Sequence, residues 1–185
     1  MKPLTETVKK QLRLIIQPGD VCIDATAGNG NDTLFLAEQV GQDGHVYAFD
    51  IQESAIKNTR LLLEQNQQLK QVNLLLKSHE YLIECLPENA KAKINLIMFN
   101  LGYLPGSDKS CITRTTSTLK ALEQSVQLIN LNNKGGVISI MLYPNHDGGR
   151  EETQAVYEWA ERLPSGFEKE IITTPGPQWL KIQKL

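Results

Sequence analysis

A glycine-rich turn and a carboxylate that follows a later apolar run are the residues whose types and spacing first suggest chemistry. Residues 21–32 read VCIDATAGNGND, an apolar run that continues through Gly28 and Gly30 into a polar helix start. At such a junction, glycines let the backbone approach a ligand, and the helix N-terminus offers unpaired N–H groups. The apolar run 45–49 ends at Asp50, whose carboxylate could accept hydrogen bonds from both hydroxyls of a ribose. Together they predict a site for a nucleotide-like ligand.

Two further residues narrow the kind of ligand. Thr33 occupies the third glycine position, so the full Gly-x-Gly-x-x-Gly pattern of dinucleotide sites is absent. Asp24 precedes the glycines, where a carboxylate disfavours a pyrophosphate and favours a cationic amino-acid group. The pattern therefore favours a ligand with a ribose and a positive charge over NAD. A glycine pair used only for packing is the alternative at this turn.

A second group of candidate residues follows the fourth predicted strand, in residues 99–106 (FNLGYLPG). An open α/β sheet places its ligand chemistry at this end of its strands. The side-chain oxygen of Asn100 could orient an N–H group, and Tyr103 offers a flat face to a base. Alternatively, Asn100 caps a turn and Tyr103 covers the core.

Two candidate proton acceptors lie on either side of this segment. His146, in the polar stretch 143–152 (YPNHDGGREE), titrates in the range useful for proton transfer, although a loop histidine is often just solvated. Asp32 is the second candidate, or else a first-turn carboxylate favoured by the helix dipole. Tyr143 opens the same polar stretch and is a candidate contact to the acceptor.

The hydroxyl-rich stretch 109–118 (KSCITRTTST) carries two cations before the next predicted helix. Lys109 and Arg114 could bind phosphates. A solvated loop whose Ser and Thr cap the helix is equally consistent with this composition.

Hydrophobic periodicity defines the elements that must position these residues. Apolar residues at helical spacing predict a first helix from Leu4 to Ile15, and the chain then turns at residues 17–20. Short apolar runs predict strands at residues 21–25, 45–49, 72–76, 94–99, 136–142, 167–173 and 179–184. Helical patterns between them predict helices at residues 32–40, 53–64, 81–86, 117–131 and 151–163.

This alternation predicts an α/β fold: a Rossmann-like, doubly wound, mostly parallel seven-stranded sheet with helices on both faces. The last two strands follow each other without a helix, which predicts an antiparallel edge strand. The chain has 185 residues and shows no linker, so we expect a single domain over residues 1–185, with the helix of residues 1–17 packed on it.

Composition excludes several classes of protein. With 41% hydrophobic and 22% charged residues, the chain is typical of a globular protein rather than a disordered or fibrous one. No apolar run is long enough to span a bilayer, and the N-terminus lacks a hydrophobic signal segment, so we expect a cytoplasmic protein without a membrane partner. Three cysteines without a Cys-x-x-Cys pair predict reduced thiols and no metal site.

A net charge of −2 provides no general positive field for holding nucleic acid. This disfavours DNA coating, but an enzyme that binds one structured RNA through a local basic patch remains consistent with it. We expect one compact face, or a homodimer that extends it, to recognise such an RNA.

Residues 24–32 together with Asp50 resemble the first two motifs of the class I S-adenosylmethionine-dependent methyltransferases. That resemblance implies that Gly28 and Gly30 line the methionine part of S-adenosyl-L-methionine, that Asp50 binds its ribose, and that Asp24 lies near its amino-acid end. His79 or Glu80 would accept a hydrogen bond from the adenine or donate one to it, and a polar turn after a strand is the alternative for these two residues. The implied cofactor set is Asp24, Thr26, Gly28, Asn29, Gly30, Asn31, Asp32, Asp50, Ile51, Gln52, Ser78, His79, Glu80 and Asn100.

Over almost its whole length, the chain also resembles a small bacterial family labelled as rRNA methylases. Members are known to methylate the exocyclic aminomethyl group of a modified wobble uridine in tRNA. The resemblance implies an N-methyltransferase that binds the tRNA anticodon arm, with Asn100, Tyr103, Asp32 and His146 as catalytic residues and with Tyr103, Lys109, Arg114, Tyr143 and His146 contacting substrate. Asn145 and Asp147 depart from the Gly-His-Pro-Gly-Gly typical of this family's late loop. Leu101 and Gly102 depart from a motif of the amino-methylating class I enzymes, in which Asp or Asn is followed by two prolines and an aromatic residue.

Three rival functions remain at this point. A methyltransferase acting on a small-molecule amine or on rRNA would share every cofactor residue. A non-catalytic module that binds S-adenosylmethionine would bind without turnover. An NAD-linked oxidoreductase would bind nicotinamide cofactor instead.

Overall fold

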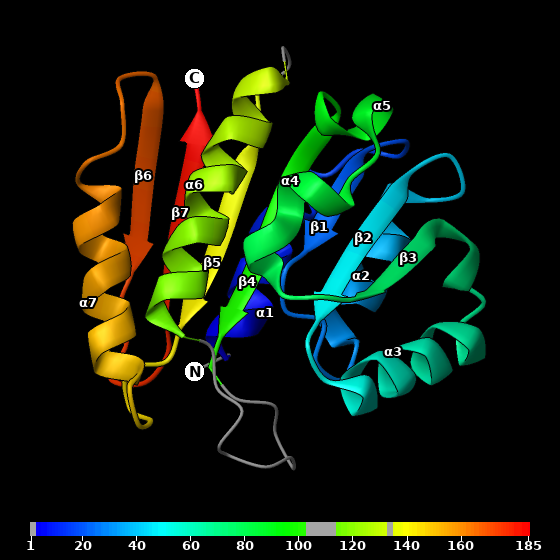
Figure 1. Cartoon of the computed structure of the whole chain (residues 1–185), viewed down its shortest axis with the longest axis horizontal. Helices are drawn as coiled ribbons and strands as arrows, with labels where there is room; N and C mark the ends of the chain where they lie inside the picture. Colours follow the sequence, from blue (N-terminus) through cyan, green and yellow to red (C-terminus); the bar gives the residue numbers. More distant parts are fainter. Residues whose placement is uncertain (1–2, 103–113, 133–134) are drawn as a thin grey trace.

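The computed structural model describes residues 3–102, 114–132 and 135–185. Within them, one seven-stranded sheet runs through the molecule in the order β3-β2-β1-β4-β5-β7-β6 (Figure 1). The strands are β1 (Val21–Asp24), β2 (His45–Asp50), β3 (Val72–Leu76), β4 (Ile94–Leu101), β5 (Val137–Leu142), β6 (Phe167–Ile172) and β7 (Gln178–Lys184).

The pairing of the strands confirms the predicted fold class. Strands β3, β2, β1, β4 and β5 pair in parallel, and β7 runs antiparallel to both β5 and β6. The antiparallel strand therefore lies one place inside the edge, and β6 is the edge strand itself. The register places Asp24, the last residue of β1, opposite Ala48 and Met98. The carboxyl ends of the parallel strands β1, β2 and β4 thus lie side by side along one rim of the sheet.

Helices cover both faces of the sheet. Helices α1, α2 and α3 contribute side chains to one hydrophobic cluster, and α4 to α7 contribute to the cluster on the opposite face (Figure 1). The bounds are α1 (Leu4–Leu12), α2 (Asn31–Val40), α3 (Glu53–Gln65), α4 (Leu82–Cys85), α5 (Glu88–Lys91), α6 (Thr115–Leu131) and α7 (Gly149–Ala160), with 3₁₀ turns η1 (Leu69–Gln71) and η2 (His79–Tyr81).

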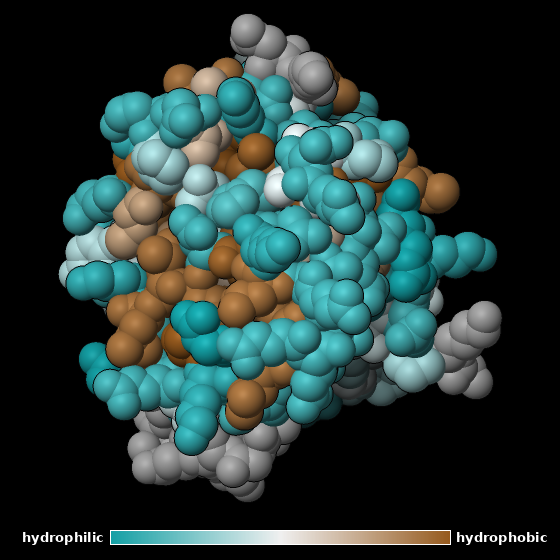
Figure 2. All heavy atoms as spheres, turned by 90° about the vertical axis from the view of Figure 1, so that its right-hand side faces the viewer, coloured by the Kyte–Doolittle hydropathy of each residue, from teal (hydrophilic) through white to brown (hydrophobic). Residues whose placement is uncertain are grey.

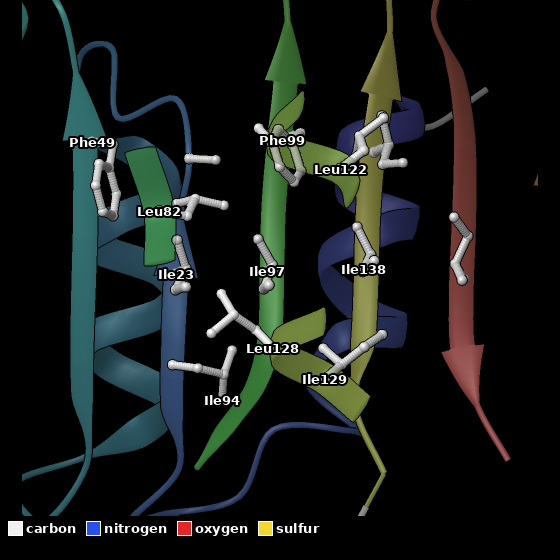
Figure 3. Packing of buried hydrophobic residues seen from close by; sticks show 14 of the residues in the cluster. Ile23, Phe49, Leu82, Ile94, Ile97, Phe99, Leu122, Leu128, Ile129 and Ile138 are labelled. Atoms are coloured by element: carbon white, nitrogen blue, oxygen red, sulfur yellow. The ribbon is translucent and has the colours of Figure 1, made fainter. Parts of the chain in front are cut away.

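The core explains why the strands read as apolar runs. All six residues of β5 are buried, as expected for a strand covered on both faces. Figure 3 shows Ile23, Ile97 and Ile138 lying in a row across β1, β4 and β5, with Leu128 and Ile129 of α6 packed near them. This rigid layer holds the strand ends in place.

Several elements differ from the predictions. Helix α7 spans Gly149–Ala160 rather than residues 151–163, and β4 continues to Leu101. Helix α1 ends at Leu12 rather than at Ile15, because residues 13–15 form a turn. The backbone N–H groups of Ile15 and Ile16 both donate to the carbonyl of Leu12 in this turn, and Ile16 is buried. The helix predicted at residues 81–86 is the 3₁₀ turn η2 followed by α4. The elements η1 and α5 were not predicted, since three or four residues are too few to show a period.

The β3 end of the sheet is less covered than its centre. Helices α4 and α5 have only four residues each, and large apolar residues of α3 and β3 are exposed, namely Leu61 and Leu76. Figure 2 shows hydrophobic side chains in the middle of this face. A search of the described residues found no helix with the length and apolar character needed to cross a membrane.

Candidate functional site

A cavity of about 1040 Å³ opens at the carboxyl ends of β1, β2, β4 and β5. Small-molecule sites commonly measure about 300–1,000 Å³, so this cavity has room for a cofactor and part of a second reactant. Its walls come from the turn after β1, the segments after β2 and β3, and the loop after β5. Helix α1 and the β6–β7 connection, at Gly176 and Pro177, complete it.

Asp50 is fixed by the backbone around it. Its Oδ2 accepts the N–H of Gly28 and its Oδ1 accepts the N–H of Gln52, each at 2.9 Å. A carboxylate offers about four lone-pair sites, so each oxygen can still accept a hydroxyl from the cavity. Gly28 reaches Asp50 in a left-handed conformation, with φ +54°. This geometry suits the predicted role of Asp50 as a ribose acceptor.

Helix α3 holds the glycine-rich turn from the other side. The hydroxyl of Thr59 donates to the carbonyl of Gly28 at 3.0 Å, and Asn58 donates to the side-chain oxygen of Asn29 at 3.1 Å. Gly30 is buried with φ +84°, and a Cβ there would lie 2.9 Å from the Cα of Thr59. Gly30 does not belong to the cavity lining. Packing on α3 by itself requires a glycine at this position, and contact of Gly30 with the cofactor stays a prediction.

Asp24 likewise lies behind the cavity wall. It is 1% exposed, and its carboxylate accepts hydrogen bonds from the N–H of Thr26 at 3.1 Å and the hydroxyl of Thr33 at 2.6 Å. Burial, and to a smaller extent the charges of Asp32 and Asp50, raises the pKa of Asp24 to about 7. Thr33, which replaces the third glycine of the dinucleotide pattern, thus supports this carboxylate. Asp24 therefore lies beneath the glycine-rich turn and does not line the cavity.

The segments that follow β2 and β3 form the end of the cavity predicted for adenine. The lining includes Ile51, Gln52, Ser78, His79 and Glu80. The Nδ1 of His79 lies 3.1 Å from the carbonyl oxygen of Ala25, and because a carbonyl only accepts, this nitrogen carries the proton. Burial lowers the pKa of His79, which keeps the ring neutral.

Asn100 is held on three sides at the end of β4. Its side-chain amide donates to Oδ2 of Asp32, and its Oδ1 accepts the hydroxyl of Tyr143 at 3.1 Å. Its backbone N–H donates to the hydroxyl of Thr26 at 2.7 Å. A carboxylate only accepts, so the amide nitrogen must face Asp32 and the amide oxygen must face Tyr143. Asn100, Asp32 and Tyr143 were each predicted separately, and the structure brings them into one network.

Lys9 is the member of this network that sequence analysis did not single out. Its Nζ lies 2.8 Å from Oδ1 of Asp32 and donates to the carbonyl oxygen of Asn31 at 3.3 Å. Lys9 stands on the polar face of the first helix together with Lys10 and Arg13. The helical period identifies that face, but it does not show which of its cations reaches the site.

The loop after β5 folds back over the end of β4. A Cβ on Gly149 would lie 2.2 Å from the carbonyl oxygen of Tyr143, so the loop can take this path only with glycine there. The Nε2 of His146 lies 3.5 Å from where a Cβ of Gly102 would be. His146 therefore stands over the chain next to Asn100 and lines the same cavity. Burial and, secondarily, Asp32 raise the pKa of Tyr143, which keeps its hydroxyl a donor.

Arg114 reaches the rim of the cavity just before α6, and Thr116 and Ser117 of the first helical turn line it as well. Two predicted substrate residues, Tyr103 and Lys109, lie outside the described residues. Gly176 and Pro177 line the cavity although no pattern in the sequence marked them.

A mostly parallel seven-stranded sheet with one antiparallel strand, and a cavity above a glycine-rich turn and an acidic strand end, define the Rossmann-like S-adenosylmethionine-dependent methyltransferases. Residues 46–174 match the family model described as "Putative rRNA methylase", and the chain belongs to this family. Both the predicted resemblance and the predicted class of cofactor are thereby confirmed.

Two solved structures cover the chain completely. A "putative rRNA-methylase" from Clostridium thermocellum is 32% identical, with a TM-score of 0.91 and 99% of its length covered. SMU.1697c, "a putative methyltransferase" from Streptococcus mutans in complex with SAH, is 33% identical, with a TM-score of 0.84 and 99% of its length covered.

A curated relative gives a more specific name. The chloroplastic tRNA (mnm(5)s(2)U34)-methyltransferase of Arabidopsis thaliana is 42% identical over 171 residues, or 88% of this chain. The chain spans 61% of the length of that relative.

Proposed function

We propose that this protein transfers the methyl group of S-adenosyl-L-methionine to the exocyclic aminomethyl nitrogen of 5-aminomethyl-(2-thio)uridine at the wobble position of tRNA. The observation that carries this proposal is the 42% identity, over 88% of the chain, to a protein named as a tRNA (mnm(5)s(2)U34)-methyltransferase. The size of the cavity supports it, since there is room for an acceptor beside the cofactor.

The cofactor half of the cavity fits S-adenosylmethionine on the evidence of its own residues. Asp50 retains lone pairs for two hydroxyls, and the turn at Gly28 brings backbone to the cavity without a side chain. His79 and Glu80 present polar groups where a base would lie. When bound, the cofactor supplies a methyl group made electrophilic by a sulfonium.

The acceptor nitrogen must be neutral and correctly placed. An alkylamine such as that of lysine has a reference pKa of about 10.4, so it is mostly protonated near neutral pH. The Oδ1 of Asn100 accepts one hydrogen bond from Tyr143 and keeps a lone pair for an N–H of the amine. This bond would turn the nitrogen lone pair toward the methyl group, and placement of this kind accounts for much of the rate of such reactions.

The two candidate proton acceptors now differ in their surroundings. Both oxygens of Asp32 are engaged, one by Lys9 and one by Asn100, so Asp32 serves to orient Asn100. His146 lines the cavity beside Gly102, and its Nδ1 faces the carbonyl of Asp147 at 2.8 Å, so the proton of the amine would pass to Nε2, a buried atom that must first become accessible. Arg114, exposed at the rim, would contact a phosphate of the anticodon arm.

The test is methyl transfer from labelled S-adenosylmethionine to tRNA from cells that lack this protein, followed by mass analysis of the wobble nucleoside. We expect a gain of one methyl on aminomethyluridine, lost in Asn100→Ala and kept in Asn66→Ala. Asn66 is exposed, and its side chain donates to the carbonyl of Leu62 in its own helix, so it is a matched control. A methylated small-molecule amine in place of tRNA would contradict the proposal, and cofactor binding without transfer to any acceptor would identify a binding module.

Ribosomal RNA is a second candidate substrate. The family description names an rRNA methylase, and the Ribosomal RNA small subunit methyltransferase H of Streptococcus mutans is 30% identical over 89 residues, or 48% of this chain. The same assay with small ribosomal subunits separates the two candidates. Label in the subunits and none in tRNA would replace the tRNA proposal.

A further inference from the structure

We propose that Lys9 of α1 is a positioning residue for the methyl acceptor, acting through Asp32 on Asn100. The ion pair of Lys9 holds Asp32 in the orientation that accepts the Asn100 amide, and the amide oxygen then faces the cavity. The inference rests on the proposed function in one respect, namely that Asn100 meets the acceptor.

The contacts of Lys9 are directed at the start of α2. Its Nζ lies 2.8 Å from Oδ1 of Asp32 and 3.3 Å from the carbonyl oxygen of Asn31, and it lies 5.3 Å from the ring centroid of Phe35. The side chains of Lys9 and Asp32 are only 21% and 16% exposed. Ion pairs that are shielded from water in this way hold a defined geometry better than exposed pairs do.

Asp32 needs a counter-charge at this place. The charge of Asp32 and, to a smaller extent, that of Asp50 raise the pKa of the buried Asp24, so Asp32 lies among other carboxylates. Among the described residues, Lys9 is the cation that the structure pairs with Asp32. A bare Asp32 carboxylate would attract the protonated acceptor amine and stabilise the form that cannot attack a methyl group. The ion pair with Lys9 removes this competing interaction.

If Lys9 had a purely structural role, it would serve to hold α1 against the sheet. Helix α1 is anchored by buried apolar residues, Leu4, Val8 and Leu12, which do not depend on the ion pair. Arg13 of the same chain segment also lies 5.3 Å from the ring centroid of Phe35, but the structure gives it no ion pair with Asp32 among the described residues. Arg13→Met is therefore the matched control, since it removes a cation from the same segment and the same ring.

The experiment compares Lys9→Met, Lys9→Arg and Arg13→Met in the full chain. Nuclear magnetic resonance of protein labelled with ¹⁵N-asparagine follows the side-chain amide of Asn100, assigned by its loss in Asn100→Ala. Methyl transfer to aminomethyluridine-containing tRNA gives kcat and KM, and titration gives the affinity for S-adenosylmethionine.

We expect Lys9→Met to shift the Asn100 side-chain signal and to lower kcat by about tenfold or more, the effect of losing one charge-assisted contact, with cofactor affinity nearly unchanged. Lys9→Arg should restore both, and Arg13→Met should alter neither. If Lys9→Met unfolds, Lys9→Gln replaces it, because its amide is neutral and its shorter side chain ends one atom before the Nζ that contacts Asp32.

An unchanged Asn100 signal in folded Lys9→Met or Lys9→Gln overturns the proposal. The same holds if Arg13→Met shifts the signal equally. The resonance measurement needs no acceptor, so it decides the role of Lys9 even if the wild-type protein fails to methylate tRNA. Failure of the proposed function would appear separately, as absent transfer by the wild-type protein.

Discussion

The two halves of the cavity are built in different ways. In the half that we propose holds the cofactor (the cofactor half), Asp50 is bonded to the backbone N–H groups of Gly28 and Gln52, so short stretches of main chain fix its position. The half that we propose faces the methyl acceptor (the acceptor half) is joined mainly by side-chain contacts between four distant segments, at Lys9, Asp32, Asn100 and Tyr143.

This difference predicts how substitutions act in each half of the cavity. A carboxylate held by main chain tolerates changes in the surrounding side chains, because the backbone path sets its geometry. A network of side chains changes whenever one member changes, since each member orients the next. We therefore expect substitutions in the first half to act on cofactor affinity or on the fold, and substitutions in the second half to act on turnover.

The largest effect is expected for Asp50→Ala. The variant loses the predicted ribose acceptor and leaves the N–H groups of Gly28 and Gln52 without it. Hydrogen bonds to a charged group contribute about 1.5–3 kcal/mol each, so affinity for S-adenosylmethionine should fall by about 100-fold or more. Isothermal titration measures it, with Asp43→Asn, an exposed carboxylate elsewhere, as control. A loss of affinity of less than about threefold would show that Asp50 does not bind the cofactor.

Gly30→Ala should test whether this glycine serves the fold. The substitution forces a side chain into φ +84° and places its Cβ 2.9 Å from the Cα of Thr59. We expect the free energy of unfolding to fall by about 2–3 kcal/mol, from strain and overpacking together.

Gly19→Ala separates these two causes. Gly19 has φ +90°, close to that of Gly30, but a Cβ there would meet nothing within 4 Å, so the loss should be about 1 kcal/mol. Urea unfolding compares the pair, and equal losses would show that packing against Thr59 contributes nothing.

Asp24→Asn should change how stability depends on pH. Burial, with the charges of Asp32 and Asp50, raises the pKa of Asp24 to about 7. The unfolded value is about 3.9, so between about pH 4 and about pH 7 the folded protein binds more protons and this group's contribution to stability falls as pH rises. The variant lacks this dependence. Its free energy of unfolding, relative to that of the wild type, should therefore rise by up to about 1.4 kcal/mol per pH unit in that window.

Urea unfolding at several pH values measures the difference for Asp24→Asn. Asp43→Asn is again the control, because Asp43 is exposed. The same pH dependence in wild type and Asp24→Asn would show that Asp24 is not the group that titrates.

The smallest effect is expected for Tyr143→Phe, which removes one neutral hydrogen bond to Oδ1 of Asn100. Such a bond contributes about 0.5–1.5 kcal/mol, so kcat should fall by about two- to tenfold, and cofactor affinity should stay the same. Steady-state methyl transfer and titration measure the two quantities. Tyr157→Phe, whose hydroxyl bonds Gln178 away from the cavity, is the matched control. A fall in cofactor affinity instead of kcat would contradict the division of the cavity into a cofactor half and an acceptor half.

Much of the fold could be predicted because periodicity is a local property. The apolar runs at residues 72–76 and 94–99 match β3 and most of β4, since a buried parallel strand must be apolar along its length. The short elements η1 and α5 could not be predicted, because so few residues carry no periodic signal.

The candidate site divides in the same way. Gly28 and Asp50 were recognised because their chemistry depends on a strand end and a turn, both written in consecutive residues. Asp24 and Gly30 belong to the same stretch, but whether they face the ligand or the core depends on packing against Thr33 and α3, which no local pattern shows.

By itself, the sequence determined the class of fold and the class of cofactor, and the role of Asp50 as a ribose acceptor stays a prediction. The tertiary structure alone decided that Lys9 meets Asp32, that Asp32 holds Asn100, and that the loop after β5 brings Tyr143 to the same point. The physical reason is distance along the chain. Neighbouring residues constrain one another through the backbone, whereas residues that are tens of positions apart meet only when the core packs and places their elements side by side.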